Sequence, residues 1–448
     1  MNLKNLMIII SLCLSWLVLQ AQDDLSRVAV GKAELEKEKI LATAINVKTT
    51  LRELQKKELE EVQDVLKKDF KYYPKRFEMA EDSLGQALFE QGDVLENLKA
   101  KGLSYWIEGE VLNEGGKQQI VLRARDVRNK IVLAEKKSLF PEGGEGRTMA
   151  HQFTDELYRA ITAKRSIFNS QVIFVSDRDG SRRKVIKEVY MADFDGANVH
   201  RMTHHNGIVI SPDLSFDGKK IVYSLISDKD LSKRNINLYL LDIPTGHSEL
   251  LSSRPGINSG AMFMPDNQHI VLTLSDSGNA EIYLMNIKSK EQRQITKHYG
   301  IDVDPSIIAD GTLLTFLSNR DGTANVYTLD PRGIEKDVKR ISYVGKFNAT
   351  PRFSPDGKEI VFVSWLDDVF DIFRINSDGT GLVRLTKNFG SNEEPFYSPD
   401  GQFVVFSSKR LTAGSPIVQN VYIMDRDGEI LGPITKNYGN CTTPRWSK

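Results

Sequence analysis

A turn signal recurs along this chain at a nearly constant spacing. An Asp followed by Gly or Asn stands between two apolar runs at Asp217, Asp266, Asp310, Asp356 and Asp400, and the spacings are 49, 44, 46 and 44 residues. A repeat of this length indicates an array of supersecondary units, because each unit buries its apolar face against its neighbours.

Each unit has the same internal pattern. In the clearest copy, four short apolar segments follow one another at 351–354, 360–364, 371–375 and 382–386. They are rich in β-branched and aromatic residues, and the connections carry Gly, Asp, Asn and Pro, which favour tight turns. Four strands in 40 to 50 residues are typical of a propeller blade.

The repeat predicts six blades, one of which is split between distant parts of the chain. The second strands of the blades are expected near Val172, Ile221, Ile270, Leu313, Ile360 and Val404. The first of them lacks a preceding Pro-containing strand, and Thr443–Ser447 aligns with that strand in the clearest copy, Thr350–Ser354. We therefore expect a mainly β fold, a six-bladed β-propeller over 166–448 that is closed by its C-terminal strand.

The first residues read as a secretory signal peptide over 1–21. Lys4 provides the positive charge, Leu6–Leu19 form the apolar stretch, and Ala21 is small enough to precede a cleavage site. The alternative is a retained anchor, although a membrane span needs about 20 apolar residues. Cys13 has no lipobox before it, and Cys441 would be the single cysteine after cleavage, so no internal disulfide is expected.

Residues 22–165 lack the repeat and predict a small α/β domain. A charged segment over 49–70 has helical periodicity, and further strands are expected at 28–30, 40–47, 104–112, 118–126 and 130–139. The expected apolar stripe of that helix consists of Leu51, Leu54, Val62, Val65, Leu66 and Phe70. A second helix over 146–163 leads into the first blade through a short linker, which predicts that the two domains are held close together.

Charge gives little indication of a partner. The chain has 60 basic and 60 acidic residues, a balance that argues against nucleic acid.

The junction between the two domains carries a family resemblance. Ala150–Tyr158, Ile161–Thr162, Phe168 and Val172–Ser176 resemble the helix-to-propeller junction of the TolB family, periplasmic components of the Tol-Pal envelope system. The order of signal peptide, small α/β domain and six-bladed propeller is also similar. The turns at 213–218, 264–267 and 308–311 depart from the usual Ser-Pro-Asp-Gly form.

The resemblance implies a periplasmic scaffold and not an enzyme, with no cofactor and no metal. It implies that the propeller mouth binds Pal, the peptidoglycan-associated lipoprotein, and that the mature N-terminal segment contacts TolA. That segment is Gln22, Asp23, Asp24 and Leu25. The implied role is support of outer-membrane integrity and of envelope constriction at division, by a protein that does not span the membrane and is a monomer outside its complex.

Propeller geometry predicts where a binding site lies. The loops that join the outer strand of one blade to the inner strand of the next converge around the channel, and polar residues in them suit a partly wet protein interface. The expected partner-binding residues are His205, Asn206, Asn258, Asp302, Asp304, Asn348, Thr350, Asn392, Glu394, Asn440 and Thr443.

Several alternatives remain open from the sequence. His204 and His205 could bind a metal with further ligands, and the turns at 177–180, 193–196 and 425–428 have the carboxylate spacing of a calcium loop without its later acidic residue. A hydrolase of the prolyl-oligopeptidase type would need a Gly-Xaa-Ser-Xaa-Gly elbow, which the chain lacks. A carbohydrate-active lyase or hydrolase could use Asp304, Glu394 and His205 as acid/base residues. A third possibility is a divergent propeller scaffold with another periplasmic ligand.

Overall fold

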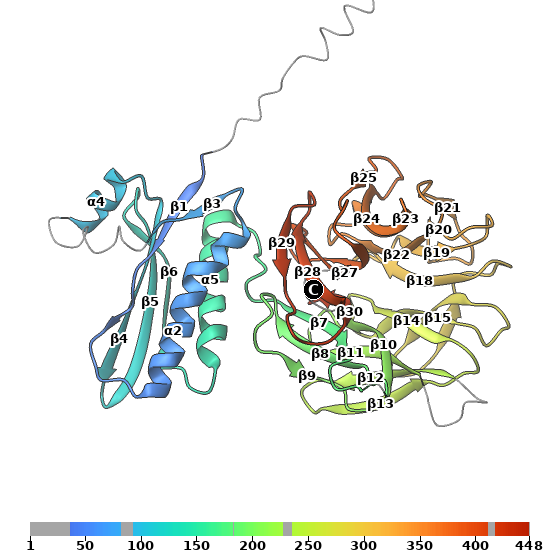
Figure 1. Ribbon diagram of the computed structural model, residues 1–448, viewed down its shortest axis with the longest axis horizontal. Helices are drawn as coiled ribbons and strands as arrows, with labels where there is room; N and C mark the ends of the chain where they lie inside the picture. Colours follow the sequence, from blue (N-terminus) through green and yellow to red (C-terminus); the bar gives the residue numbers. More distant parts are fainter. Residues whose placement is uncertain (1–35, 82–92, 182, 227–234, 411–416, 448) are drawn as a thin grey trace, which may run out of the picture.

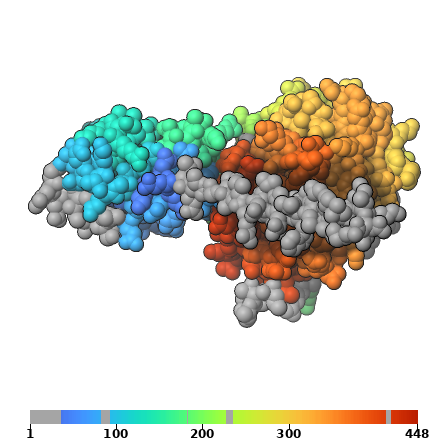
Figure 2. Space-filling model, turned by 90° about the horizontal axis from the view of Figure 1, so that it is seen from above, coloured from blue at the N-terminus to red at the C-terminus, as the bar shows by residue number. Residues whose placement is uncertain are grey.

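The computed structural model describes residues 36–81, 93–181, 183–226, 235–410 and 417–447. The expected signal peptide, the segment Gln22–Leu25 and the expected strand at 28–30 lie outside these residues. The described chain forms two lobes, an α/β domain and a β-propeller (Figures 1 and 2). In the described parts of the chain, no helix is long and apolar enough to cross a membrane.

The α/β domain contains one six-stranded sheet in the order β3-β1-β4-β5-β6, with β2 paired to β4. Its strands are β1 (Glu38–Ala42), β2 (Asn46–Val47), β3 (Phe77–Met79), β4 (Tyr105–Glu114), β5 (Lys117–Asp126) and β6 (Ile131–Leu139). Strands β4, β5 and β6 form an antiparallel meander, whereas β1 is parallel to β3 and β4. The strands predicted at 104–112, 118–126 and 130–139 are confirmed, whereas the segment predicted at 40–47 forms two strands, β1 and β2, separated by residues 43–45.

Two long helices lie between this sheet and the propeller (Figure 1). The helical elements are α2 (Glu53–Lys68), the 3₁₀ turn η1 (Asp69–Tyr72), α4 (Val94–Ala100) and α5 (Glu145–Thr162). The two predicted helices are confirmed. The inclusion of Leu54 in the buried stripe is wrong, because its side chain is 80% exposed. The buried face of α2 instead runs through Gln55, Leu59 and Val62, which places position 54 outside that stripe.

Six four-stranded antiparallel sheets form the propeller in the described residues. The second blade contains β10 (Ile208–Leu214), β11 (Lys220–Ile226), β12 (Ile236–Asp242) and β13 (His247–Ser252), and the third contains β14 (Asn258–Phe263), β15 (His269–Leu274), β16 (Glu281–Asn286) and β17 (Gln292–Gln294). The fourth blade contains β18 (Asp302–Ile307), β19 (Leu314–Ser318), β20 (Asn325–Leu329) and β21 (Lys339–Arg340), and the fifth contains β22 (Asn348–Phe353), β23 (Glu359–Leu366), β24 (Val369–Asn376) and β25 (Val383–Arg384). The sixth blade contains β26 (Ser391–Tyr397), β27 (Phe403–Arg410), β28 (Val418–Asp425) and β29 (Ile430–Pro433).

The first blade joins the two ends of the repeat, as predicted. Its order is β30 (Cys441–Trp446), β7 (Gln171–Ser176), β8 (Glu188–Asp193) and β9 (His200–Arg201). Trp446 lies opposite Val172, is fully buried, and donates a hydrogen bond from Nε1 to Ser170 Oγ at 2.7 Å. The C-terminal strand is therefore the inner strand of the first blade.

The recurring turn has a local chemical cause. In the fifth blade, Ser354 Oγ donates to Asp356 Oδ1 at 2.6 Å and accepts from the Glu359 amide at 3.0 Å. Gly357 adopts a left-handed φ of 69°, a conformation that glycine adopts at low cost. The turn signal that recurs in the sequence therefore marks a hydrogen-bonded turn between the inner strand and the second strand of a blade.

A prediction arises at Gly196, in the turn between β8 and β9. Its φ is 86°, and a Cβ there would overlap the backbone carbonyl of Ile434 in the sixth blade. Gly196→Ala should therefore lower the free energy of unfolding by more than about 2 kcal/mol, since strain and a backbone clash add. Gly218→Ala is the matched control, because its φ is 69° with open space around the Cβ, and it should cost about 1 kcal/mol. Equal losses in urea unfolding would contradict the close packing of the two blades.

Candidate binding site at the propeller channel

The six inner strands share one irregularity. Each contains a register shift, and each shift spans a residue with left-handed φ at the equivalent position. These residues are Ser211, Gly260, Asp304, Thr350, Glu394 and Thr443, with φ values between 48° and 61°. Five of the six are not glycine, and such a conformation costs about 1–2 kcal/mol per residue. Bulges re-aim side chains, and strained backbone clusters at functional sites.

Charged and polar side chains from these bulges interact across neighbouring blades. Arg352 forms an ion pair with Asp304 at 2.5 Å. Glu394 accepts hydrogen bonds from the Thr443 amide and from Thr443 Oγ1, the latter at 3.0 Å. Burial, followed by the positive charge of Arg352, lowers the pKa of Arg445 to about 10. The inner strands therefore surround a polar interior with both signs of charge.

The loops at one end of the inner strands carry large exposed apolar side chains. Tyr299 is 84% exposed and Tyr343 is 76% exposed, and both lie in loops that lead into the inner strand of the next blade. Ile301 and Phe347 are exposed in the same two loops. Exposed aromatic residues with a polar surround are typical of protein-binding surfaces. We call this surface, formed by the loops 204–207, 253–257, 297–301, 342–347, 387–390 and 436–440, the rim.

Four of the predicted partner-binding residues are fully buried. Asn258, Asp302, Asn348 and Asn392 stand at or next to the start of their inner strands with no exposed surface. Each holds a neighbouring element instead; Asn258 Oδ1 accepts from Ser252 Oγ at 2.6 Å, for example. The expectation that these four side chains face the channel mouth is wrong, because they complete hydrogen-bond networks inside the blades. We therefore propose no direct partner contact for them.

Similar hydrogen-bond networks hold Asp302, Asn348 and Asn392 at the start of the inner strands of the other three blades. Asp302 pairs with Arg320 at 2.8 Å, Asn348 Nδ2 donates to Asn325 Oδ1 at 3.0 Å, and Asn392 Nδ2 donates to Asp371 Oδ1 at 3.1 Å.

The remaining predicted residues lie at the rim or in the bulges. Asn206 and Asn440 are exposed, His205, Asp304, Thr350 and Glu394 are partly exposed, and Thr443 is buried beneath them. Asn440 is fixed by Asp177, which accepts from its amide at 2.7 Å and from Nδ2 at 2.8 Å. Their role in binding stays a prediction.

Sequence reasoning missed two groups of residues at this site. It did not identify the rim aromatics Tyr299 and Tyr343, nor the channel arginines Arg352 and Arg445. A signal for Tyr299 was available, because Tyr299, Phe389 and Tyr438 each precede the Gly of the loop that leads into the next inner strand. Tyr343 stands two residues before Gly345 and does not fit this pattern. The two arginines directly follow the recurring Pro of the inner strand, and the residue type at this position differs from blade to blade.

The proposed metal and acid/base roles have competing partners in the structure. His205 Nε2 lies 2.6 Å from Tyr223 Oη, and burial lowers the pKa of His205. Asp304 is paired with Arg352, while Glu394 is held by Thr443.

The Asp-rich turns considered for calcium are likewise occupied by protein groups. Asp425 and Asp427 both pair with Lys75 at 2.6 Å, Asp193 accepts from Asn198 Nδ2 at 2.7 Å, and Asp179 accepts from Arg201 at 2.9 Å.

The α/β domain packs on the end of the propeller opposite the rim. Tyr73 Oη donates to Asp400 Oδ2 at 2.7 Å, and the Tyr73 ring packs edge-on against Phe403 at 5.1 Å. Asp400 lies in a turn between first and second strands, Asp425 ends a third strand, and Asp427 lies in the turn that follows it. Turns of these two kinds are all at the opposite ends of the strands from the rim loops, so the described residues of the α/β domain contact the end of the propeller away from the rim.

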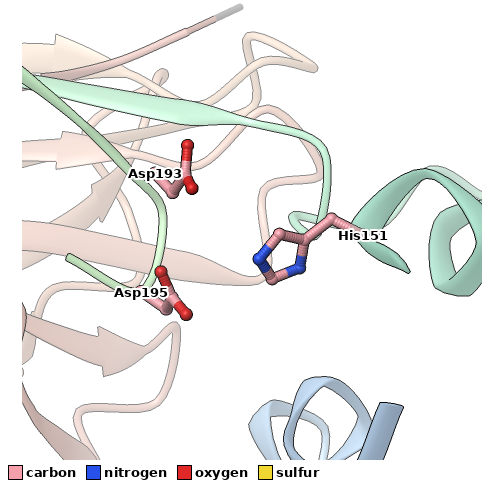
Figure 3. Close-up of side chains that lie close together, drawn as sticks. All are labelled: His151, Asp193 and Asp195. Carbon is pink, nitrogen blue, oxygen red and sulfur yellow. The ribbon is translucent and has the colours of Figure 1, made fainter. Parts of the chain in front are cut away.

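A buried titratable cluster connects the two domains. His151 of α5 faces Asp193 and Asp195 of the first blade (Figure 3), and one ligand-type atom from each residue lies within 4.8 Å of the others. His151 Nδ1 lies 3.0 Å from Asp69 Oδ2. The arrangement could hold a cation, but Arg147 already supplies one, since its guanidinium pairs with Asp195 and lies 3.5 Å from His151 Nε2.

The cluster binds protons more tightly when the chain is folded. Burial alone would lower the pKa of His151, but the hydrogen bond and charge of Asp69, with the charge of Asp195, raise it above its usual value of 6.5. Burial raises the pKa of Asp69 and of Asp193. Because the folded state holds more protons than the unfolded state, these groups make stability decrease as pH rises.

A pH dependence of stability follows. Above pH 6.5 the unfolded His151 is largely neutral, so the stability that its charged form provides is lost as pH rises through the raised pKa of the folded state. We expect the thermal midpoint to fall as pH rises above 6.5, and to fall less in His151→Gln. His247→Gln, at an exposed histidine, is the control and should keep the wild-type slope. His205 does not contribute here, because its lowered pKa acts below 6.5. Identical slopes for all three proteins would contradict the assignment.

A six-bladed β-propeller that carries a separate α/β domain on one end defines the class of this protein. The family model of the TolB beta propeller domain matches residues 158–448, which is more than half of the sequence. The chain therefore belongs to the TolB β-propeller family.

Individual relatives agree with this assignment. The "Protein TolB homolog" of Chlorobium luteolum is 30% identical over 234 residues, 52% of this chain and 50% of the relative. The "Tol-Pal system protein TolB" of Francisella tularensis subsp. holarctica is 28% identical over 312 residues, 67% of this chain and 69% of the relative. The alignments with this homologue and with the "Protein TolB homolog" of Chlorobium chlorochromatii span about half the length of those two relatives. The crystal structure of TolB from Acinetobacter baumannii shares the fold with a TM-score of 0.75 at 24% identity, over 93% of this chain and 98% of that one.

Proposed function

We propose that this protein is a periplasmic scaffold of a Tol-Pal system and has no enzymatic activity. Its rim binds a Pal-like peptidoglycan-associated lipoprotein, and its mature N-terminal segment binds a TolA-like protein anchored in the inner membrane. Through these contacts it supports outer-membrane integrity and envelope constriction at division. Family membership and the names of the relatives support this proposal.

The exposed aromatic rim is the observation that carries the proposal. Tyr299 and Tyr343 are largely solvent-exposed in two successive rim loops, and the described residues of the α/β domain do not cover them. Tyrosine supplies a large contact area with a polar tip, which is why it is enriched in protein interfaces. The polar bulge residues Asp304, Thr350 and Glu394 lie below this surface and suit hydrogen bonds to an inserted loop of a partner.

The path of the chain supports coupling between the two proposed sites. The described chain begins beside the junction of the domains, where Glu38 pairs with Arg76 at 3.0 Å and the adjacent Lys75 pairs with Asp425 and Asp427 of the propeller. The segment that binds this partner is therefore joined to the rest of the chain next to the interdomain contacts. Binding at one site can then change affinity at the other, and the coupling must be reciprocal.

Truncation of the rim aromatics tests the proposed site. Tyr299→Ala with Tyr343→Ala should weaken binding of the globular domain of the Pal-like lipoprotein about tenfold or more, measured by titration calorimetry. Leu54→Ala is the control, because it removes an 80% exposed apolar side chain from the α/β domain. Unchanged affinity in the double variant, with wild-type thermal stability, would remove the rim as the binding site.

A further inference from the structure

Strand β6 forms a long open edge of the α/β sheet. It pairs with β5 and packs against α5 on one face, and no other strand of the described residues pairs with it. The other sheet edge, β3, has only three residues. An exposed strand edge is a template for addition of another strand, because its backbone groups have no partner.

The register shows which backbone groups of β6 face outward. The Phe140 amide donates to Gln118 O at 2.9 Å, so the backbone groups at 140, 138, 136 and 134 face β5. Those at 135, 137 and 139 must face away, since direction alternates along a strand. In the part of the chain that the structure describes, they have no backbone partner. A bulge at Leu133 ends the regular edge, which therefore spans 134–139.

A ladder of alternating charges crosses the solvent-facing side of the sheet and ends at this edge. Lys48 pairs with Glu110 at 2.6 Å, Glu110 with Arg123 at 3.0 Å, and Arg123 with Glu135 at 2.6 Å. Glu135 is 48% exposed and has an open side, where the next strand would lie. Lys137, two residues further along the same face, is also 48% exposed and pairs with Glu114 at 3.0 Å.

The opposite face of the edge borders an open groove. The groove has a volume of about 940 Å³ and is lined by Lys136 and Ser138 of β6 and by Met149 and Gln152 of α5. Lys136 Nζ donates to Gln152 Oε1 at 3.1 Å across it. Side chains of an added strand that point toward α5 would enter this groove next to Met149.

We propose that the β6 edge binds an extended segment of another polypeptide, which adds as an antiparallel strand. The segment carries a basic side chain opposite Glu135, an acidic side chain opposite Lys137, and a small apolar residue between them that faces the groove. We identify this partner by charge complementarity. Its basic side chain would pair with Glu135, where the ladder of alternating charges now ends. The site lies in the α/β domain and is separate from the rim.

A designed peptide tests the proposal on the full chain. The probe is a fluorescent peptide with the core Val-Thr-Glu-Val-Lys-Val, whose Glu and Lys would lie opposite Lys137 and Glu135. The control peptide has the same sequence with N-methyl groups on that Glu and that Lys, which removes the two ladder donors and keeps the charges. We expect saturable binding of the probe in fluorescence anisotropy and at least about tenfold weaker binding of the control.

Variants of the protein locate the binding on the edge. Lys137→Pro removes an outward donor without breaking the β5 pairing and should abolish binding, whereas Lys137→Thr retains the donor and should bind. Glu135→Lys combined with Lys137→Glu should weaken probe binding about tenfold, because opposite charges become like charges. Glu60→Lys, at an exposed position of α2 away from the groove, is the charge control and should bind as wild type. Far-UV circular dichroism verifies that each variant is folded.

Three results would overturn the proposal. Equal binding of the two peptides would show that no strand is added. Binding that survives Lys137→Pro would place the peptide elsewhere. A concentration-dependent dimer in sedimentation velocity that Lys137→Pro dissociates would assign the edge to a second copy of this chain.

Discussion

A chain that ends at Asn440 is expected to lose the propeller as a cooperative unit. The truncation removes β30, the inner strand of the first blade, which pairs with β7 along its length. It also removes Trp446, whose fully buried ring and Nε1 hydrogen bond to Ser170 anchor the closure. Loss of a buried Trp side chain alone costs about 3–5 kcal/mol, and the edge of β7 would also lose its backbone partners.

Near-UV circular dichroism and limited proteolysis measure this effect. The truncated chain should lose its tertiary signal and be cleaved throughout 166–440, while a chain that ends at Ser447 should behave as wild type, because it keeps the hydrogen bond from the Ser447 amide to Gln171 O at 2.8 Å. Trp446→Ala should fall between them, with a cooperative transition at lower temperature. A truncated chain with a wild-type unfolding transition would show that closure by β30 does not stabilise the ring.

Asp69→Ala is the second large effect that we expect, with a loss of about 3 kcal/mol or more in the free energy of unfolding. Asp69 is buried and accepts from Thr154 Oγ1 at 2.5 Å, and its Oδ2 lies 3.0 Å from His151 Nδ1. Removal of the carboxylate leaves His151 Nδ1 without this partner inside the protein, while Thr154 Oγ1 keeps only its backbone acceptors in α5, such as His151 O at 3.0 Å. Breaking one side of a buried polar network costs several kcal/mol, because the group that loses its partner is neither solvated nor paired.

Asp64→Ala is the matched control for this variant. Asp64 pairs with Lys68 at 2.7 Å on the solvent-exposed surface of α2, the helix that precedes Asp69, and a surface pair contributes about 0–1 kcal/mol. Urea unfolding of both variants gives the comparison. If the two losses are equal, the interdomain cluster does not stabilise the protein.

The propeller could be predicted because its information is local. The hydrogen-bonded turn at Ser354 and Asp356 needs residues within a few positions of one another, so it leaves a period in the sequence. The displaced strand at 443–447 was found by the same pattern, without any long-range information. The helix over 146–163 was also predicted, because Met149, Phe153 and Leu157 recur at the spacing of one helical face.

The details of the site could not be predicted in the same way. Asn258 and Asn440 occupy similar loops, yet one is buried and the other exposed, because their burial depends on how neighbouring blades pack. The cluster of Asp69, His151 and Asp195 joins residues from three separate segments, and none of those segments has a motif that indicates the contact. Leu54 is a further example. Which face of α2 is buried depends on how the helix packs against its neighbours, and the positions of its apolar residues alone did not predict that Leu54 is exposed.

Co-purification from envelope extract tests the central claim most directly. Tagged full-length protein is isolated under gentle conditions from the native envelope, beside the Tyr299→Ala, Tyr343→Ala variant. We predict that a Pal-like peptidoglycan-associated lipoprotein elutes with the wild-type chain and is depleted at least about tenfold with the rim variant. Absence of that lipoprotein from the wild-type eluate, or equal recovery with both chains, would contradict a scaffold that binds through its rim.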